Sequence, residues 1–485
     1  MKNLLHILTA SLYILSALLM AGCTPSPTNV QTIDELPPIF PDYIDVTLPP
    51  NIAPAVFSLR GDYKNMIVTA DGNECSFDEA EWHKLLEEHK GKSLEMTVVA
   101  QKGSGEWVQF KPFHINVAEE PIDSFMTYRL IEPDYEVFSH LQIQERNITN
   151  FDTRNICDYE LVGNRCMNCH TYGQNRPDLS FMYVRGEGGG MILNRNGVLR
   201  KLNIKTPEMT GGAVYAQFSP NGRYLVFSTN NIIPAFHSKP ENRMEVYDAT
   251  SDVYVADLET NTVISSPLLA DTTKMETFPC FTPDGKSIIY CKADFSRKAE
   301  EMNYSLYRIG FDQNTGKIAE EEECIFEARE GEKRSVCHPR VSPDGQYLLF
   351  TVADFGTFHL WHREADQRMM RLKADDTGSY PVDSLDIVNS DLSDSYHSWG
   401  SNSRWFVFAS KRDDGLYGRP FICYIDKNGK AHKPFALPQK HPLFYDNCLK
   451  SFNAPELGRA AVAFDPDDVQ QIMKQESESF MMKND

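Results

Sequence analysis

The segment on which the architecture of this chain rests reads Pro339-Arg340-Val341-Ser342-Pro343-Asp344-Gly345-Gln346-Tyr347-Leu348-Leu349-Phe350. Its centre is a tight turn, because proline presets φ at the first corner and glycine adopts the positive φ that follows. An apolar run of β-forming residues comes directly after the turn. The segment therefore predicts a β-hairpin with a buried second strand.

The same pattern occurs four times in the second half of the chain. Its other copies lie in 216–228, 279–290 and 398–410, and the turns start at 219, 282, 342 and 401, which gives spacings of 63, 60 and 59 residues. The fourth copy lacks both the proline and the glycine. Self-similarity at a fixed period is typical of repeat architectures such as β-propellers.

These segments resemble the WD40-like Pro-Asp-Gly repeats of TolB-type β-propellers over residues 180–465. The resemblance implies an all-β chain with a C-terminal propeller of five or six blades in 181–466. Strands in Phe181–Leu202 and near Ala460–Phe464 are expected to complete the ring and join the two chain ends in one blade. The repeats exceed the ~40–45 residues of a four-stranded blade, so long insertions are expected, for example in 231–250.

The N-terminus has the features of an export signal. Lys2 precedes an apolar run, Leu4 to Leu19, which is interrupted by polar residues and is followed by Met20-Ala21-Gly22-Cys23. A short positive start, a brief apolar segment and small residues before a cleavage point are typical of secretion. The ending resembles a bacterial lipobox, which implies a lipoprotein signal peptide in 1–22 and acylation of Cys23.

The segments between the leader and the repeats are predicted from composition and alternation. Prolines in 23–44 favour an extended tether. Short strand-like runs in 45–120 favour a small β-sandwich-like domain with one helix that opens at Ser76-Phe77-Asp78-Glu79. Residues 121–180 are interpreted as a connector, with a short helix in 137–144, and residues 467–485 as a tail.

The connector contains Cys166-Met167-Asn168-Cys169-His170, the C-x-x-C-H pattern of a c-type haem attachment site. Two thiols at this spacing can add to the two vinyl groups of the porphyrin, and the adjacent histidine can ligate the iron. The pattern predicts one covalent haem c held by Cys166 and Cys169, with His170 as the metal ligand. The alternatives are a disulfide loop or a redox dithiol beside a histidine.

Four residues before each turn start, the repeats carry an aromatic or imidazole side chain. The first strand of a propeller blade lines the central channel, so these residues are expected to form a ring that faces the axis. His338 or His397 would then be the sixth iron ligand, with Met182, Met191 and Met209 as rivals, and a five-coordinate iron is a further alternative. Alternatively, the rings pack between blades and the histidines bond to the backbone. The four ring residues are Tyr215, Phe278, His338 and His397.

The net charge bears on the class of partner, and two cysteines in the second repeat bear on disulfide bonding. The formal net charge of −20 disfavours a nucleic-acid partner, because phosphate backbones are bound by basic surfaces. Cys280 and Cys291 flank the second turn, where a cross-strand disulfide and two free buried thiols are both possible.

The lipobox, the C-x-x-C-H motif and the repeats together resemble a family of exported haem-binding propeller lipoproteins of Gram-negative bacteria. The closing stretch 450–456 also resembles the end of that family. Membership implies a lipid anchor in the outer membrane, facing the periplasm, and provides no catalytic residues. The first hypothesis is electron transfer to or from a periplasmic redox partner. The second is a non-catalytic binding or scaffold propeller of the cell envelope with a structural or sensory haem, and the third is a haem enzyme such as a peroxidase.

Overall fold

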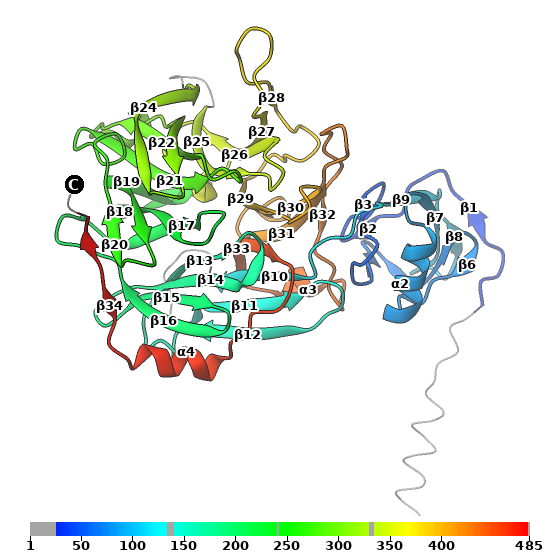
Figure 1. The fold of residues 1–485 in the computed structure, drawn as a ribbon. Coiled ribbons are helices and arrows are strands. Elements are labelled where there is room, and N and C mark those ends of the chain that lie inside the picture. The colour runs from blue at the N-terminus through cyan, green and yellow to red at the C-terminus, as the bar shows by residue number, and fades with distance from the viewer. Residues whose placement is uncertain (1–25, 133–139, 240–241, 329–333, 484–485) are drawn as a thin grey trace, which may run out of the picture.

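The computed structural model describes residues 26–132, 140–239, 242–328 and 334–483. A small N-terminal domain lies beside a larger ring of sheets (Figure 1). The predicted signal peptide, 1–22, and the acylation site, Cys23, lie outside the described residues. None of the described helices is long and apolar enough to cross a bilayer.

The N-terminal domain consists of a seven-stranded mixed sheet, a two-stranded sheet and one described helix. The sequence predicted a small β-sandwich-like domain with one helix for 45–120. Helix α2 (Glu79–Glu88) begins at Asp78, whose carboxylate accepts the backbone N–H groups of Ala80 and Glu81, and it buries Trp82 and Leu86 against the sheet. The nine strands of this domain are β1 (Gln31–Thr32), β2 (Ile39–Phe40), β3 (Thr47–Leu48), β4 (Ser58–Leu59), β5 (Tyr63–Ala70), β6 (Asn73–Glu74), β7 (Ser93–Lys102), β8 (Trp107–Gln109) and β9 (Phe113–Val117).

The predicted tether is shorter than 23–44. Strand β1 pairs in parallel with β8, β2 pairs with β4, and the ring of Tyr43 is fully buried. Proline-rich extended chain is typical of a linker, but an extended chain can also add to the edge of a sheet, where missing N–H groups are tolerated. The domain therefore already includes residues 31–44.

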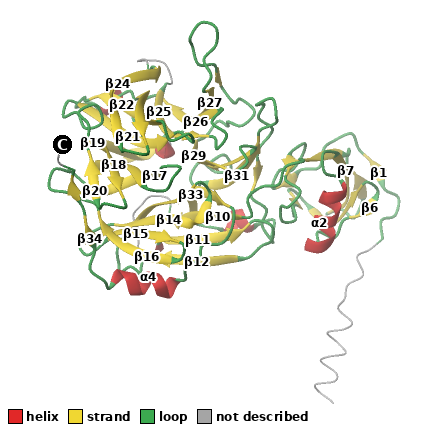
Figure 2. Ribbon diagram, in the orientation of Figure 1, coloured by secondary structure: helices red, strands yellow, loops and turns green. Residues whose placement is uncertain are grey.

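Six sheets form the ring (Figure 2). Four of them have four strands, and the other two have a fifth, short strand at the outer edge. Their innermost strands, β13, β17, β21, β25, β29 and β33, each contact the next one and close the circle. The fold is a six-bladed β-propeller, in agreement with the predicted five or six blades. Written from the axis outward, the blades are β33 (Ser451–Gly458), β10 (Phe125–Ile131), β11 (Gln142–Asn147), β12 (Thr153–Asp158); β13 (Met167–Gly173), β14 (Arg176–Val184), β15 (Gly190–Arg195), β16 (Val198–Asn203); β17 (Ala213–Phe218), β18 (Tyr224–Lys239), β19 (Asn242–Asp257), β20 (Thr262–Ile264); β21 (Lys274–Phe281), β22 (Ser287–Asp294), β23 (Ser305–Asp312), β24 (Lys317–Phe326); β25 (Ser335–Val341), β26 (Tyr347–Ala353), β27 (Asp366–Arg371), β28 (Val382–Asp383); and β29 (Asp394–Trp399), β30 (Trp405–Ser410), β31 (Arg419–Tyr424), β32 (Phe435–Ala436).

The ring is closed at a different place from the one predicted. Strand β33 pairs antiparallel with β10, so the C-terminal strand is the innermost strand of a blade whose other three strands come from 125–158. The interpretation of 121–180 as a connector was therefore wrong, as was the strand expected near 460–464. Within the predicted helix 137–144, residues 137–139 lie outside the described residues and Gln142–Gln144 belong to strand β11.

The Pro-Asp-Gly turns share one hydrogen-bond arrangement. The backbone N–H of Tyr347 donates to the Ser342 hydroxyl at 3.0 Å, that hydroxyl donates to Asp344 at 2.7 Å, and Gly345 has φ of 73°. Tyr224 with Ser219 and Ser287 with Thr282 repeat the first of these bonds at 2.9 and 3.0 Å.

The fourth turn starts one residue earlier than the sequence alignment had it. The N–H of Ser403 donates to the Gly400 carbonyl, as that of Gly345 donates to the Ser342 carbonyl, and Ser403 itself adopts φ of 60°. Gly400 rather than Ser401 is therefore the equivalent of Ser342. Without the proline and glycine, nothing in the sequence marked the register of this turn.

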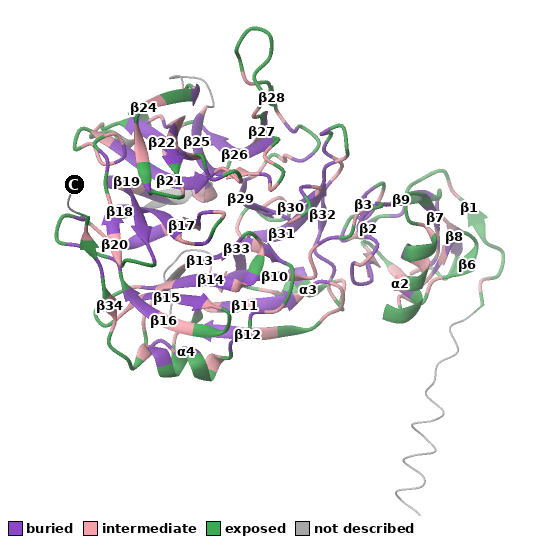
Figure 3. Cartoon of the chain, viewed as in Figure 1, coloured by how far each residue is buried: buried purple, intermediate pink, exposed green. Residues whose placement is uncertain are grey.

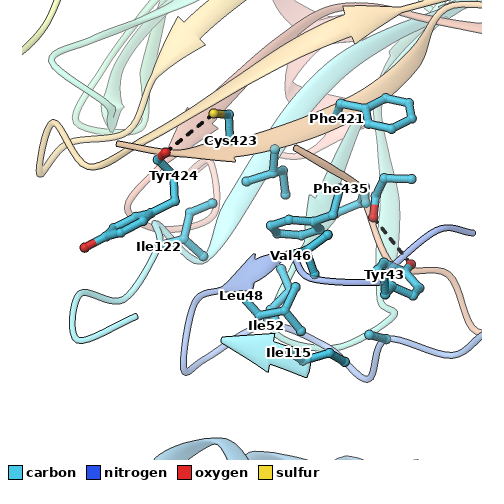
Figure 4. Packing of buried hydrophobic residues seen from close by; sticks show 14 of the residues in the cluster. Tyr43, Val46, Leu48, Ile52, Ile115, Ile122, Phe421, Cys423, Tyr424 and Phe435 are labelled. Atoms are coloured by element: carbon cyan, nitrogen blue, oxygen red, sulfur yellow. Dashed lines mark hydrogen bonds between the residues drawn. The ribbon is translucent and has the colours of Figure 1, made fainter. Parts of the chain in front are cut away.

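Buried residues are continuous from the N-terminal domain into the blade formed by β29 to β32 (Figure 3). Tyr43, Val46 and Leu48 face Phe421 and Phe435 across this interface (Figure 4). Polar bonds flank the contact, where the indole N–H of Trp405 donates to the Glu120 carbonyl at 3.1 Å and the Tyr424 hydroxyl donates to the Glu120 carboxylate at 2.7 Å. The two domains therefore share one hydrophobic core.

The C-terminal segment 466–483 runs along the outside of two blades. Helix α4 (Pro466–Met473) is followed by β34 (Glu478–Ser479) and β35 (Met481–Met482), which pair in parallel with the outer strands β16 and β20. Arg200 binds Glu478 through two hydrogen bonds of 2.8 and 2.5 Å. The predicted tail is thus an ordered strap. Short helices complete the list, namely η2 (Ala299–Glu301), η3 (His359–Trp361) and α3 (Phe444–Asn447).

Candidate functional site

Every innermost strand of the propeller bulges at one residue near the axis. At these positions φ lies between 48° and 52°, a region that non-glycine residues seldom adopt, and the pairing register shifts in each sheet. The six bulged residues, one per blade, are Cys169, Tyr215, Phe278, His338, Tyr396 and Ala454. We call them the axial ring.

The predicted ring residues Tyr215, Phe278 and His338 occupy the axial ring, whereas Tyr396 stands where His397 was expected. This difference follows from the one-residue register error in the fourth turn. The four aromatic members form an arc, with ring centroids 4.1 Å apart for Tyr215 and Phe278, 4.1 Å for Phe278 and His338, and 4.0 Å for His338 and Tyr396. Cys169 and Ala454, the two small members, leave the remaining sector of the ring open.

A polar funnel begins at this open sector and runs along the axis to the face that carries the Pro-Asp-Gly turns. Two adjoining cavities form it and share the side chains of Gln217, Arg340, Ser398 and Glu456. Water-sized space amounts to about 50 Å³ in the inner cavity and about 100 Å³ in the outer one. The residues two positions beyond the axial ring provide the walls, namely Thr171, Gln217, Cys280, Arg340, Ser398 and Glu456.

Glu456 anchors a hydrogen-bond chain across three innermost strands. Its carboxylate accepts the Thr171 hydroxyl at 2.7 Å and the Tyr172 N–H at 3.0 Å, and the amide of Gln217 donates to Thr171 at 3.1 Å. Withdrawal from water raises the pKa of Glu456 to about 7, while the two hydrogen bonds and the charge of Arg340 oppose that rise. Near neutral pH this carboxyl is therefore only partly ionised.

Three histidines line the inner cavity and are uncharged at neutral pH. Burial and the charge of Arg129 lower the pKa of His170 to about 4, and burial and Arg340 lower that of His397 to about 3. The pKa of His338 is lowered for the same two reasons. Among the described residues, the Nε2 atoms of His170 and His338 have no hydrogen-bond partner, whereas Nε2 of His397 bonds the Leu349 carbonyl at 3.0 Å.

The C-x-x-C-H motif lies at the start of an innermost strand, β13, in the wall of this funnel. Because the strand bulges at Cys169, the two thiols separate. Cys166 packs against the cluster that contains Met167 and Met182, and Cys169 packs against the cluster that contains Phe181. The inner cavity has room for only a few water molecules, and a porphyrin needs far more room. As folded, these residues do not fit a haem, and its attachment here stays a prediction.

The three methionines considered as rival iron ligands lie away from the funnel. Met182, Met191 and Met209 are core residues with at most 4% of their surface exposed. Cys280 and Cys291 are free, buried thiols, so the disulfide alternative is wrong. The pairing explains this outcome, since Cys280 lies opposite Ile289 and Cys291 opposite Thr277.

A cysteine–histidine pair beside the funnel resembles a catalytic dyad but does not meet its requirements. Sγ of Cys337 lies 2.8 Å from Nδ1 of His338. The thiol is fully buried in an apolar cluster and does not line either cavity, and burial raises its pKa strongly. A thiol that neither ionises nor meets solvent cannot act as a nucleophile, so the pair is structural.

Sequence reasoning missed Arg129, Arg340 and Glu456, the charged residues of the funnel. Arg340 lies two residues after His338 on β25, and Glu456 lies two residues after Ala454 on β33. Arg129 lies on β10, adjacent to β33. A search two positions beyond the ring would have found the first two.

Comparison with known proteins gives a likeness in fold alone. No known protein family matches the sequence, and no curated protein matches it. Among solved structures, TolB from Acinetobacter baumannii is 13% identical with a TM-score of 0.42, covering 75% of this chain and 79% of that one. A putative TolB from Agrobacterium tumefaciens is 15% identical with a TM-score of 0.37, over 72% and 96% of the two chains. The GH74 enzyme of Niastella koreensis is 9% identical with a TM-score of 0.37, over 64% and 54%.

The propeller assignment rests on the sheets themselves. Six sheets whose innermost strands close a circle define the fold. It is a six-bladed β-propeller. The activity named for any one of these proteins says nothing about this chain, because a propeller supports many unrelated functions.

Proposed function

We propose that this chain is a non-catalytic binding propeller of the cell envelope, which takes its ligand into the axial funnel from the face of the Pro-Asp-Gly turns. In this proposal the chain is exported and held at the outer membrane, facing the periplasm, by a lipid on Cys23. The observation that carries the proposal is Arg340, a half-buried guanidinium in the throat of the funnel.

Arg340 is unusual because its charge is left without a carboxylate partner among the described residues. Within the described part of the chain, its side chain donates one hydrogen bond, to the neighbouring Pro339 carbonyl at 2.9 Å. Charged groups withdrawn from water are ordinarily paired. A cation without an ion-pair contact in an open polar passage is therefore a feature of a binding site. The described residues of the funnel offer no ionised nucleophile for catalysis.

Photo-crosslinking from the funnel rim tests the proposal. A photoreactive residue replaces Arg459, which is exposed and lines the outer cavity, and the control replaces Glu321, which is exposed on the outer strand β24. We expect a specific crosslink in intact cells from position 459 and none from position 321. Crosslinks from 321 alone, or equal patterns from both positions, would contradict the proposal.

The second candidate is electron transfer by a covalent haem c that exchanges electrons with a periplasmic partner. It is favoured by the intact C-x-x-C-H motif and by the buried Nε2 of His170, which lacks a hydrogen-bond partner among the described residues. It requires the part of the funnel wall that contains the motif to rearrange, so that a porphyrin has room to bind. An exported chain with covalent haem supports this candidate, and one with both thiols free excludes it.

A further inference from the structure

The funnel has a positive electrostatic character although the chain as a whole is acidic. Two arginines, Arg129 and Arg340, line the inner cavity, and Arg459 lines the outer one. Glu456 is the one carboxylate that lines either cavity, and it is engaged by Thr171 and Tyr172. The histidines add no charge at neutral pH. A ligand that enters therefore meets more positive than negative charge.

The geometry of Arg340 suits an oxyanion. The single bond to the Pro339 carbonyl uses one N–H of a group that has five donors. The remaining edge of the guanidinium can bind two oxygens of one carboxylate or phosphate in parallel. Uncharged donors and acceptors of Gln217 and Ser398 stand on the same wall and can bind the rest of the head group.

The width of the funnel limits the size of this ligand. Cavities that hold whole drug-sized molecules measure roughly 300–1,000 Å³, whereas the water-sized space here is about 50 and about 100 Å³. Only a compact head group, or the narrow end of a longer molecule, can reach Arg340.

We propose that Arg340 binds a compact oxyanion, a carboxylate or a phosphate, that enters the funnel from the face of the Pro-Asp-Gly turns. This inference rests on the proposed function and names the chemistry of its ligand. Carboxylate and phosphate share the pair of oxygens that the guanidinium recognises, so the two sources are separated by experiment.

The test measures binding of malonate and of inorganic phosphate by calorimetry at constant ionic strength. The full chain is compared with R340Q, R340K and the control R176Q, in which an exposed arginine paired with Asp178 is replaced outside the funnel. Loss of a charge-assisted pair is expected to weaken binding by about 10- to 100-fold in R340Q. R340K should bind with intermediate affinity, and R176Q should bind like the wild type.

The calorimetric results distinguish the two kinds of oxyanion and can also exclude binding at Arg340. Malonate binding alone identifies a carboxylate site, and phosphate binding alone a phosphate site. Equal affinity in R340Q and the wild type, or no binding of either anion to the wild type, overturns it. A rim crosslink that persists in R340Q would leave the proposed function intact while the anion inference fails, and Arg340-dependent anion binding without any rim crosslink would show the reverse.

Discussion

A chain truncated after Lys450 is expected to be unable to form a cooperatively folded propeller. The truncation removes β33, whose partner β10 then has an unpaired edge on the axis, and it removes the fully buried Leu457 and nearly buried Phe452. Losing buried side chains of this size costs about 2–5 kcal/mol each, which approaches the whole stability of a typical domain. Denaturation by urea, followed by tryptophan fluorescence, measures the effect.

A truncation after Gln475 is the matched control. It removes β34 and β35, which extend two outer sheet edges, together with the Arg200–Glu478 pair and the buried ring of Phe480. Partly exposed ion pairs contribute about 0–1 kcal/mol and one buried phenylalanine about 3–5 kcal/mol, so this chain should lose some stability but keep a cooperative transition. If the chain ending at Lys450 unfolds as cooperatively as the control, β33 does not close the ring.

Replacing Glu276 by glutamine is expected to remove a large part of the alkaline destabilisation of this protein. Glu276 is fully buried, its two oxygens have no hydrogen-bond partner among the described residues, and Lys292 is 3.5 Å away. Lys292 pairs more closely with Glu322, at 2.9 Å. Burial raises the pKa of Glu276 to about 8.

Because the pKa of Glu276 is higher in the folded state than in the unfolded chain, this group makes the free energy of unfolding fall as the pH rises. The folded state keeps the proton that the unfolded chain releases near its ordinary pKa of about 4.5. The stabilisation is therefore complete below pH 4.5 and is lost as the pH rises through about 8. Within this window the free energy of unfolding falls by about 1.4 kcal/mol per pH unit for this one group.

Thermal unfolding between pH 5 and 9 measures this slope in the wild type, in E276Q and in the control E321Q. Asp248 and Glu456 act in the same direction, because burial raises the pKa of each to about 7, so E276Q retains part of the slope. E321Q changes an exposed carboxylate and should follow the wild type. A slope in E276Q as steep as that of the wild type would contradict the assignment.

The propeller could be predicted because each Pro-Asp-Gly turn has a local cause. Pro343, Asp344 and Gly345 determine the turn by their own φ preferences and by the bond to Ser342, without help from distant residues. The strands that follow are then identified by their apolar runs. The same reasoning placed Tyr215, Phe278 and His338 near the axis.

The closing blade and the fourth repeat could not be predicted for the opposite reason. Strand β33 pairs with β10 from the other end of the chain, and no local pattern in 451–458 specifies that partner. In the fourth turn, Ser403 adopts positive φ without being glycine, which the surrounding blade imposes. The one-residue error that resulted put His397 where Tyr396 stands.

The funnel was missed because it exists only after the ring closes. Arg340 and Glu456 are more than 100 residues apart in the sequence and lie on β25 and β33, and only the circular arrangement of the innermost strands brings them into one wall. The C-x-x-C-H motif, in contrast, is recognised from the sequence, but its local pattern does not determine where its side chains pack. Its pattern is local, but the bulge of β13 at Cys169 directs its two thiols into different clusters.

We expect strand β13, which begins at Met167 within the C-x-x-C-H motif, to form a wall of the axial funnel without a bound porphyrin. Intact-protein mass spectrometry tests it directly, on denatured chain exported from a host with cytochrome c maturation machinery and treated with a thiol-alkylating reagent. We expect the mass of the processed chain with both Cys166 and Cys169 alkylated. A mass increased by one haem in the wild type and absent in C169S would contradict the claim and establish the electron-transfer candidate in its place.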